Sequence, residues 1–148
     1  MTYETITYTD YNGVTKTRKF YFNLNKSEII KLETMTPGGI GKSLDEAAKA
    51  KDAAKLMKFF EEIIAMSYGE KSNDGERFIK SKELSEAFMQ TEAYNQLFSD
   101  LLTDADKATK FINGIFPKEL VEAAQKENLK QIEAAKTTEI TDSNLSNQ

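Results

Sequence analysis

Apolar and polar residues alternate along the first part of the chain. Residues 2–9 and 14–22 are rich in Thr, Tyr, Ile, Val and Phe, the residue types that favour β-strands. Between them stands Asn12-Gly13, a pair that readily adopts the positive φ angles of a tight turn. Ile6 and Tyr8 would share one face of the first strand. The pattern predicts a β-hairpin, and because two strands alone are only marginally stable, we expect helices to cover one face.

From residue 25 onward the apolar residues recur every three or four positions, as in amphipathic helices. The clearest stretch is Asp52–Tyr68, where Leu56, Phe60 and Ile64 fall on one face and Phe59 and Met66 widen it. Further helices are expected after an N-cap at Asn25, over 44–50 after a cap at Ser43, and over 82–89. Thr91 and Thr103 are expected to cap helices over 92–102 and 104–113. A last helix is expected from Pro117 to about Lys136, after a C-cap at Gly114.

Two stretches interrupt this helical pattern. Residues 34–42 contain Pro37 and three glycines, and residues 68–80 form a polar segment that ends in the apolar pair Phe78-Ile79. Such compositions are typical of turns and connections. We therefore predict non-helical connections at both places.

The predicted fold is α+β and predominantly α-helical, with an N-terminal β-hairpin followed by about six helices and a polar C-terminal tail. We expect a single domain in which the hairpin of residues 1–24 packs on a helical body of residues 25–117. A last helix over 118–136 has sparse apolar positions and can project from this body. Residues 137–148 carry too little apolar surface to offset the entropy of ordering, so a mobile tail is predicted.

Composition narrows the classes of function. The chain has 148 residues, 39% of them hydrophobic, and a net charge of −4, so no strong positive field draws it to nucleic acid or anionic lipid. Cysteine and histidine are both absent. This absence excludes thiol nucleophiles, Ser-His-Asp hydrolysis and histidine-based zinc sites. We expect no catalytic site, no cofactor and no metal, and a protein as the partner.

No signal peptide or membrane span is expected. The first residues lack the basic and apolar regions of a signal sequence, and no uninterrupted apolar run approaches the ~20 residues that cross a bilayer. The chain is therefore expected in the cytosol where it is made.

The most suggestive motif is Gly41-Lys42-Ser43, which resembles the end of a phosphate-binding P-loop that opens a helix. Thr36 stands where the pattern requires glycine, and the stretch follows a helical segment, whereas a P-loop follows a buried strand. We therefore interpret it as a helix-to-helix connection with a solvated Lys42. A nucleotide-dependent enzyme that uses Lys42 stays as a minor alternative.

The acidic positions have ordinary explanations as well. The turn Glu70–Gly75 would place Ser81 where a calcium loop needs its bidentate glutamate. Asp104 and Asp106 suit the first turn of a helix, where the helix dipole favours carboxylates. Glu61 and Glu62 are expected on the solvated side of the central helix.

The order of several short segments resembles that of a known family. A hairpin ends in Phe20–Leu24, and after it come Thr36–Gly39, Ser67–Ser72, Arg77–Ser81, Thr91–Tyr94, Leu97-Phe98, Thr103–Ala105 and Phe111–Pro117. Their order and spacing, over roughly residues 5–117, are similar to those of the tail assembly chaperones of long-tailed, siphovirus-type phages and prophages of Gram-positive bacteria. No single segment is specific by itself.

The resemblance implies a non-structural factor in the host cytoplasm that binds the tape measure protein. It would keep the long apolar helices of that client soluble and help recruit tail tube subunits, then be absent from the mature virion. The resemblance also implies a longer frameshifted form, and several copies along one client with self-association would be natural. The competing hypothesis is a structural tail or tail-completion protein of the virion.

Client contact would require apolar side chains at the surface. The candidate partner-binding residues are Phe59 and Met66 on the fringe of the central helix, and Leu120, Val121, Leu129 and Ile132 on the last helix.

Overall fold

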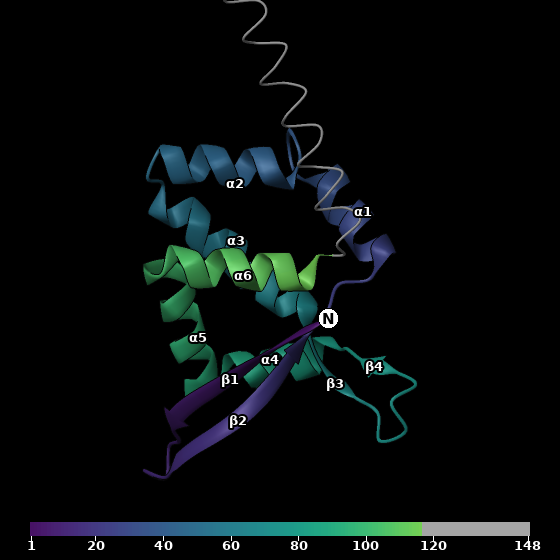
Figure 1. The fold of residues 1–148 in the computed structure, drawn as a ribbon, viewed down its shortest axis with the longest axis vertical. Coiled ribbons are helices and arrows are strands. Elements are labelled where there is room, and N and C mark those ends of the chain that lie inside the picture. The colour runs from purple at the N-terminus through teal and green to yellow at the C-terminus, as the bar shows by residue number, and fades with distance from the viewer. Residues whose placement is uncertain (117–148) are drawn as a thin grey trace, which may run out of the picture. The chain divides into compact units, whose positions relative to one another are not determined.

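A four-stranded antiparallel sheet with the strand order β1-β2-β3-β4 packs against helices in the computed structural model, which describes residues 1–116 (Figure 1). The elements are β1 (Thr2–Thr9), β2 (Thr15–Phe22), α1 (Lys26–Met35), α2 (Ile40–Lys49), α3 (Ala53–Ser67), β3 (Tyr68–Lys71), β4 (Phe78–Ile79), α4 (Lys82–Met89), α5 (Glu92–Thr103) and α6 (Ala105–Ile115). This confirms the predicted α+β fold with its N-terminal hairpin and six helices. The predicted last helix and tail lie outside the described residues.

The first hairpin forms as predicted, but its turn differs in detail. Only Gly13 has a positive φ, of 80°, and Asn12 does not. The Asp10 carboxylate instead organises the loop, because it accepts hydrogen bonds from the backbone N–H groups of Asn12 and Val14 at 2.9 and 3.0 Å. It also pairs with Lys16 at 2.7 Å. A single left-handed glycine after such a turn is typical of longer hairpin loops, and β2 accordingly begins at Thr15.

The inner face of the sheet supplies the aromatic part of the core. Phe20 and Phe22 of β2 are buried, and strand alternation brings Tyr68 of β3 to the same face because Phe22 pairs with Tyr68. The Phe88 ring of α4 stacks on Tyr68 at a centroid distance of 4.2 Å. The Phe111 ring of α6 meets Phe22 edge-on at 5.1 Å. Aromatic contacts therefore join the sheet to helices from the far end of the described chain.

The second hairpin, formed by β3 and β4, was not predicted, because residues 68–80 were expected to form a polar turn region. Tyr21 and Phe22 of β2 pair with Gly69 and Tyr68, and β3 in turn pairs with the two residues of β4. Gly69 permits this arrangement, since a Cβ there would lie 2.6 Å from an atom of the Phe78 ring. The Asp74 carboxylate accepts from the Ser72 hydroxyl and the Glu76 N–H. That carboxylate closes the turn between β3 and β4.

Three predicted caps proved wrong, and each has a physical reason. Helix α2 begins at Ile40 and not after Ser43, because the Glu33 carboxylate of α1 accepts the Ile40 N–H at 3.1 Å. Helix α5 runs through Thr103, and Asp104 caps α6 by accepting from Lys107 N–H. Gly114 lies inside α6, where a Cβ would meet Thr2 at 2.7 Å.

The remaining caps and the central helix agree with the sequence. Asn25 and Glu28 form a reciprocal capping box at α1, and Thr91 caps α5. Helix α3 buries Phe60, Ile63 and Ile64. It contacts α2, α4 and α5, while α5 also packs on β1. No helix among residues 1–116 has the length and apolar content required to cross a membrane.

Candidate partner-binding surface

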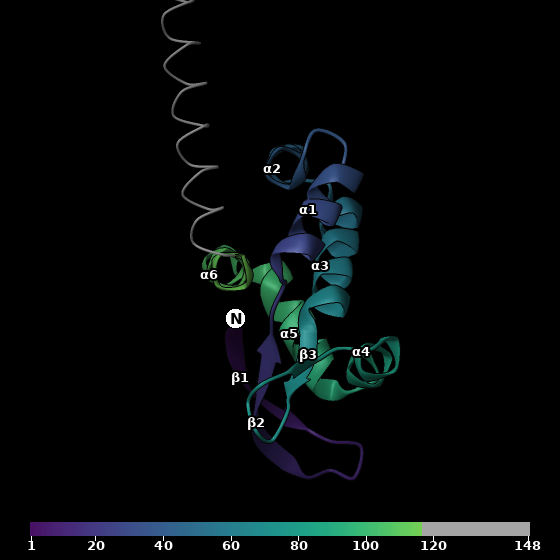
Figure 2. The same cartoon turned by 90° about the vertical axis from the view of Figure 1, so that its right-hand side faces the viewer.

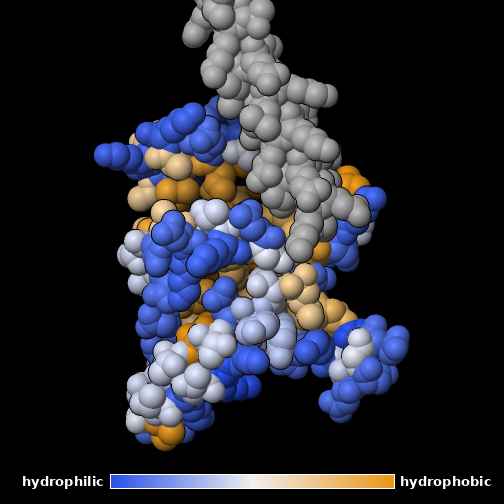
Figure 3. Space-filling model, viewed as in Figure 1, coloured by the Kyte–Doolittle hydropathy of each residue, from blue (hydrophilic) through white to orange (hydrophobic). Residues whose placement is uncertain are grey.

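Apolar surface gathers between α2 and α6 in the space-filling view (Figure 3). Both helices lie to the same side of α3 in the view of Figure 2. Helix α2 packs on α3, whereas α6 packs on α5 and β1. Different neighbours therefore hold the two helices. We call the apolar surface between them the α2–α6 groove.

The flank of α2 that faces α3 is not fully covered. Ile40 and Ala47 are buried on this flank, and Leu44, one helical turn from Ile40, is half-buried. The apolar side of α2 is therefore only partly buried. Leu44 is its half-buried apolar side chain, and we assign it to the groove.

The flank of α6 that faces the groove follows from the contacts on its other flank. Lys107 binds Asp100 of α5, and Gly114 lies close to Thr2 of β1, so these positions mark the side of α6 that faces α5 and β1. Ala108 and Ile112 lie on the opposite flank at helical spacing, and both are half-buried. Ala108 and Ile112 are therefore the half-buried apolar side chains of α6 that we assign to the groove.

The predicted contact residues Phe59 and Met66 are both half-buried. They are seven residues apart and therefore share one flank of α3. The Phe59 ring packs edge-on against Phe60 at 5.6 Å. The structure thus brings these two residues to one flank, beside the buried face of α3. Leu120, Val121, Leu129 and Ile132 lie outside the described residues.

Sequence analysis missed other exposed apolar side chains. Ile30 and Met35 of α1 are 55% and 71% exposed, and Met57 of α3 is 44% exposed. These side chains could have been found from helices whose apolar stripe is wider than contact with one neighbouring element requires. The same pattern in the sequence indicates Leu44 and Ile112.

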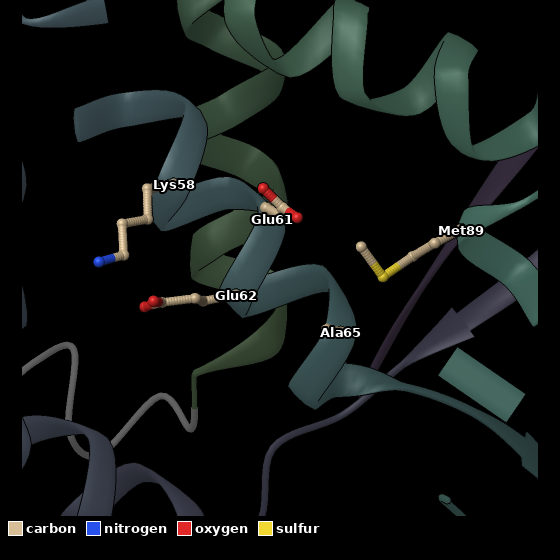
Figure 4. A pocket seen from close by; sticks show the side chains of 5 residues that line it. All are labelled: Lys58, Glu61, Glu62, Ala65 and Met89. Carbon is tan, nitrogen blue, oxygen red and sulfur yellow. The ribbon is translucent and has the colours of Figure 1, made fainter. Parts of the chain in front are cut away.

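A shallow depression of about 270 Å³ on α3 differs from the α2–α6 groove, because most of its lining side chains are charged. Lys58, Glu61, Glu62 and Ala65 of α3 line it together with Met89 of α4 (Figure 4). Both carboxylates are exposed, as predicted for the solvated side of this helix. Burial, and then the charge of Glu61, raise the pKa of the Tyr94 hydroxyl. This charged depression does not suit an apolar client.

The segment around Gly41-Lys42-Ser43 has the geometry of a connection between two helices. It follows helix α1, whereas a P-loop follows a strand. A carboxylate of the protein, that of Glu33, already accepts the first N–H of α2, in the position where a P-loop would receive a phosphate. Within residues 1–116, moreover, no three metal-ligating side chains gather into one group.

Glu4 of β1 lies near Asp100 of α5 and Lys107 of α6. Burial raises the pKa of its carboxyl above the ordinary value; the nearby Lys107 opposes this shift, and Asp100 adds to it. A carboxyl with a raised pKa is more stable in its protonated form in the folded state. It contributes stability below its unfolded-state pKa and loses that contribution as the pH rises through its folded-state pKa.

We expect the substitution Glu4→Gln to raise the melting temperature at pH 7 and to change it little at pH 3.5. Glutamine imitates the protonated carboxyl, so it removes the cost of burying a charge that exists only above the folded-state pKa. Melting curves of both chains between pH 3.5 and 7.5 measure this effect. A uniform gain at every pH would contradict the explanation, and Glu76→Gln, at an exposed turn position, is the control.

Comparison with known proteins connects this architecture to a family. The sequence profile of the family described as phage tail assembly chaperone matches residues 1–148, the whole chain. No curated protein and no solved structure matches the chain at the threshold applied. The chain belongs to the phage tail assembly chaperone family.

Proposed function

We propose that the protein binds the tape measure protein during phage tail assembly and keeps it soluble, without catalysing a reaction. The family supports a role in tail assembly, and the α2–α6 groove is the observation that supports binding of an apolar client. The resemblance to chaperones of long-tailed phages of Gram-positive bacteria suggests this client, whose long helices would expose apolar stripes before the tube forms.

The groove has the properties that an amphipathic client helix needs. Apolar flanks of two helices that border one surface can receive a helix through residues at i, i+3, i+4 and i+7. Many exposed residues of α2 and α6 are charged, among them Lys42, Asp45 and Lys110, which would keep the complex in solution. Phe59 and Met66 extend the proposed contact along α3, and Leu120, Val121, Leu129 and Ile132 are proposed to contribute further contacts.

We place this activity in the host cytoplasm and outside the finished particle. A chaperone that holds its client until tube subunits polymerise around it has to leave as the subunits arrive. Recruitment of tube subunits and binding of several copies along one client are part of the proposal. The alternative, a structural tail or tail-completion protein, would remain in purified virions.

We expect the double substitution Leu44→Ala/Ile112→Ala to reduce the yield of soluble, co-purifying tape measure protein by about tenfold, because each truncation removes apolar contact worth about 1 kcal/mol or more. Co-expression of the two proteins, followed by affinity purification and quantification of soluble client, measures this yield. Circular dichroism of the purified variant establishes whether the helices persist.

The matched control is Ile30→Ala/Ile79→Ala, which truncates two exposed aliphatic side chains elsewhere. If the two double variants lost the same amount of soluble client, the groove would not be the binding site, although the proposal that the protein binds the client would stand. If the wild-type chain neither solubilises nor binds the tape measure protein and is found in virions, the chaperone function itself is wrong.

A further inference from the structure

The outer face of the sheet carries charge of one sign only. By strand alternation and the observed register, this face comprises the odd-numbered residues of β1, β2 and β3, together with Phe78 of β4. The two acidic residues within the strands, Glu4 and Glu70, belong to the inner face. A protein with a net charge of −4 thus presents a sheet face that has two lysines and no carboxylate.

Aromatic rings and lysines are arranged in a row on this face. Tyr3 lies opposite Tyr21, with ring centroids 6.1 Å apart. The Lys19 ammonium lies 4.7 Å from the centroid of the Tyr3 ring, and the Lys71 ammonium lies 4.3 Å from that of Tyr21. The Phe78 ring continues the row over Gly69, where a side chain would displace it.

No helix of residues 1–116 covers this row. Figure 2 shows α4 and α5 on one side of the strands, and α6 lies at the Thr2 end of β1. Tyr3 is 54% exposed, and Lys19 and Lys71 are exposed. The cation–π contacts favour positions of the two flexible lysines over the rings, which lowers the entropy cost of binding through them.

We propose that this outer face, with Tyr3, Tyr21, Phe78, Lys19 and Lys71, binds an acidic surface of a second protein. Carboxylates of the partner would pair with the two ammonium groups, while short apolar side chains between them would contact the rings. The inference adds a second partner to the proposed function, and it does not use the α2–α6 groove.

A protein partner fits the face better than nucleic acid does. Single strands bind to sheet faces by stacking their bases on free aromatic rings. Here an ammonium group already lies over one face of Tyr3 and of Tyr21. A carboxylate can approach the ammonium without displacing it from the ring.

The test is an NMR titration of the full chain with a decapeptide of alternating glutamate and alanine. We expect shifts confined to the strand residues around Tyr3, Tyr21 and Lys71, and we expect them to weaken as salt is added. The variant Lys19→Glu/Lys71→Glu should bind the peptide about tenfold more weakly, since two exposed ion pairs become repulsive. The variant Lys42→Glu/Lys55→Glu has the same charge change in first helical turns, away from the sheet, and should bind as the wild type does.

Other occupants would give other results. Equal shifts with a glutamine–alanine peptide would overturn the role of the carboxylates, and stronger shifts with a thymidine decanucleotide would identify a nucleic-acid surface. Shifts that arise from raising the concentration of the chain alone would mean that a second copy covers the face. Lys19→Glu/Lys71→Glu should still solubilise the tape measure protein, so failure here is distinguishable from failure of the proposed function.

Discussion

Replacing Phe22 by alanine is expected to lower the free energy of unfolding by about 4 kcal/mol, as for other fully buried phenylalanines. The Phe22 side chain is 0% exposed. Its ring contacts three others, Tyr68 and Phe88 at 5.9 Å and Phe111 at 5.1 Å. A cavity at this point would separate β2 from β3, α4 and α6 at once.

Urea unfolding followed by circular dichroism measures this loss, which is a large fraction of the 5–15 kcal/mol typical of a native domain. Tyr21→Ala is the matched control, because the neighbouring residue points to the opposite face of the sheet. Its loss is expected to be smaller, about 1 kcal/mol, because Tyr21 is half-buried and contacts its cross-strand neighbour Tyr3. Similar losses for both variants would show that Phe22 is not the centre of the aromatic core.

Replacing Lys80 by methionine is expected to cost about 2 kcal/mol, because the change leaves the charge of a half-buried carboxylate unpaired and takes the ammonium donor away from two carbonyl groups. Lys80 forms an ion pair with Glu28 of α1, and its ammonium donates to the carbonyl oxygens of Asn23 at 2.9 Å and Met66 at 3.2 Å. One side chain thus joins β4, the start of α1 and the end of α3.

A double-mutant cycle tests this role. Glu28→Gln keeps an oxygen that can accept the Asn25 N–H of the capping box but removes the charge that faces Lys80. If the ion pair accounts for the effect, the double variant Lys80→Met/Glu28→Gln should lose less stability than the two single losses added together. Strict additivity would show that Lys80 acts through the two carbonyl groups and not through Glu28.

The predictable part of the fold came from local patterns. Alternation and a turn dipeptide identified the first hairpin, and helical periodicity identified α3, α4 and α5 to within a residue or two. The wrong predictions are at positions where contact with a residue far along the chain decides the structure. Glu33 caps α2 in place of Ser43, and contact with Thr2 explains Gly114 inside α6.

The candidate surfaces were less predictable than the elements. Phe59 and Met66 were identified as fringe residues, and both are half-buried. The groove flanks formed by Leu44 and Ile112 were not identified, because their exposure depends on which neighbours α2 and α6 pack against. The row of Tyr3, Tyr21 and Phe78 on the outer face could not be predicted, because it depends on the register of three strand pairings. One of these pairings involves β4, which has only two residues.

The sequence by itself determined the hairpin, most of the helix boundaries, the absence of cysteine and histidine chemistry, and the likeness to tail assembly chaperones. These properties depend on composition and on residues a few positions apart, where backbone geometry sets the spacing. The tertiary structure alone decided that residues 68–79 complete the sheet, that Glu33 and Lys80 connect distant elements, and which apolar and charged side chains remain at the surface. Those features depend on packing between segments far apart in the chain, which no local pattern encodes.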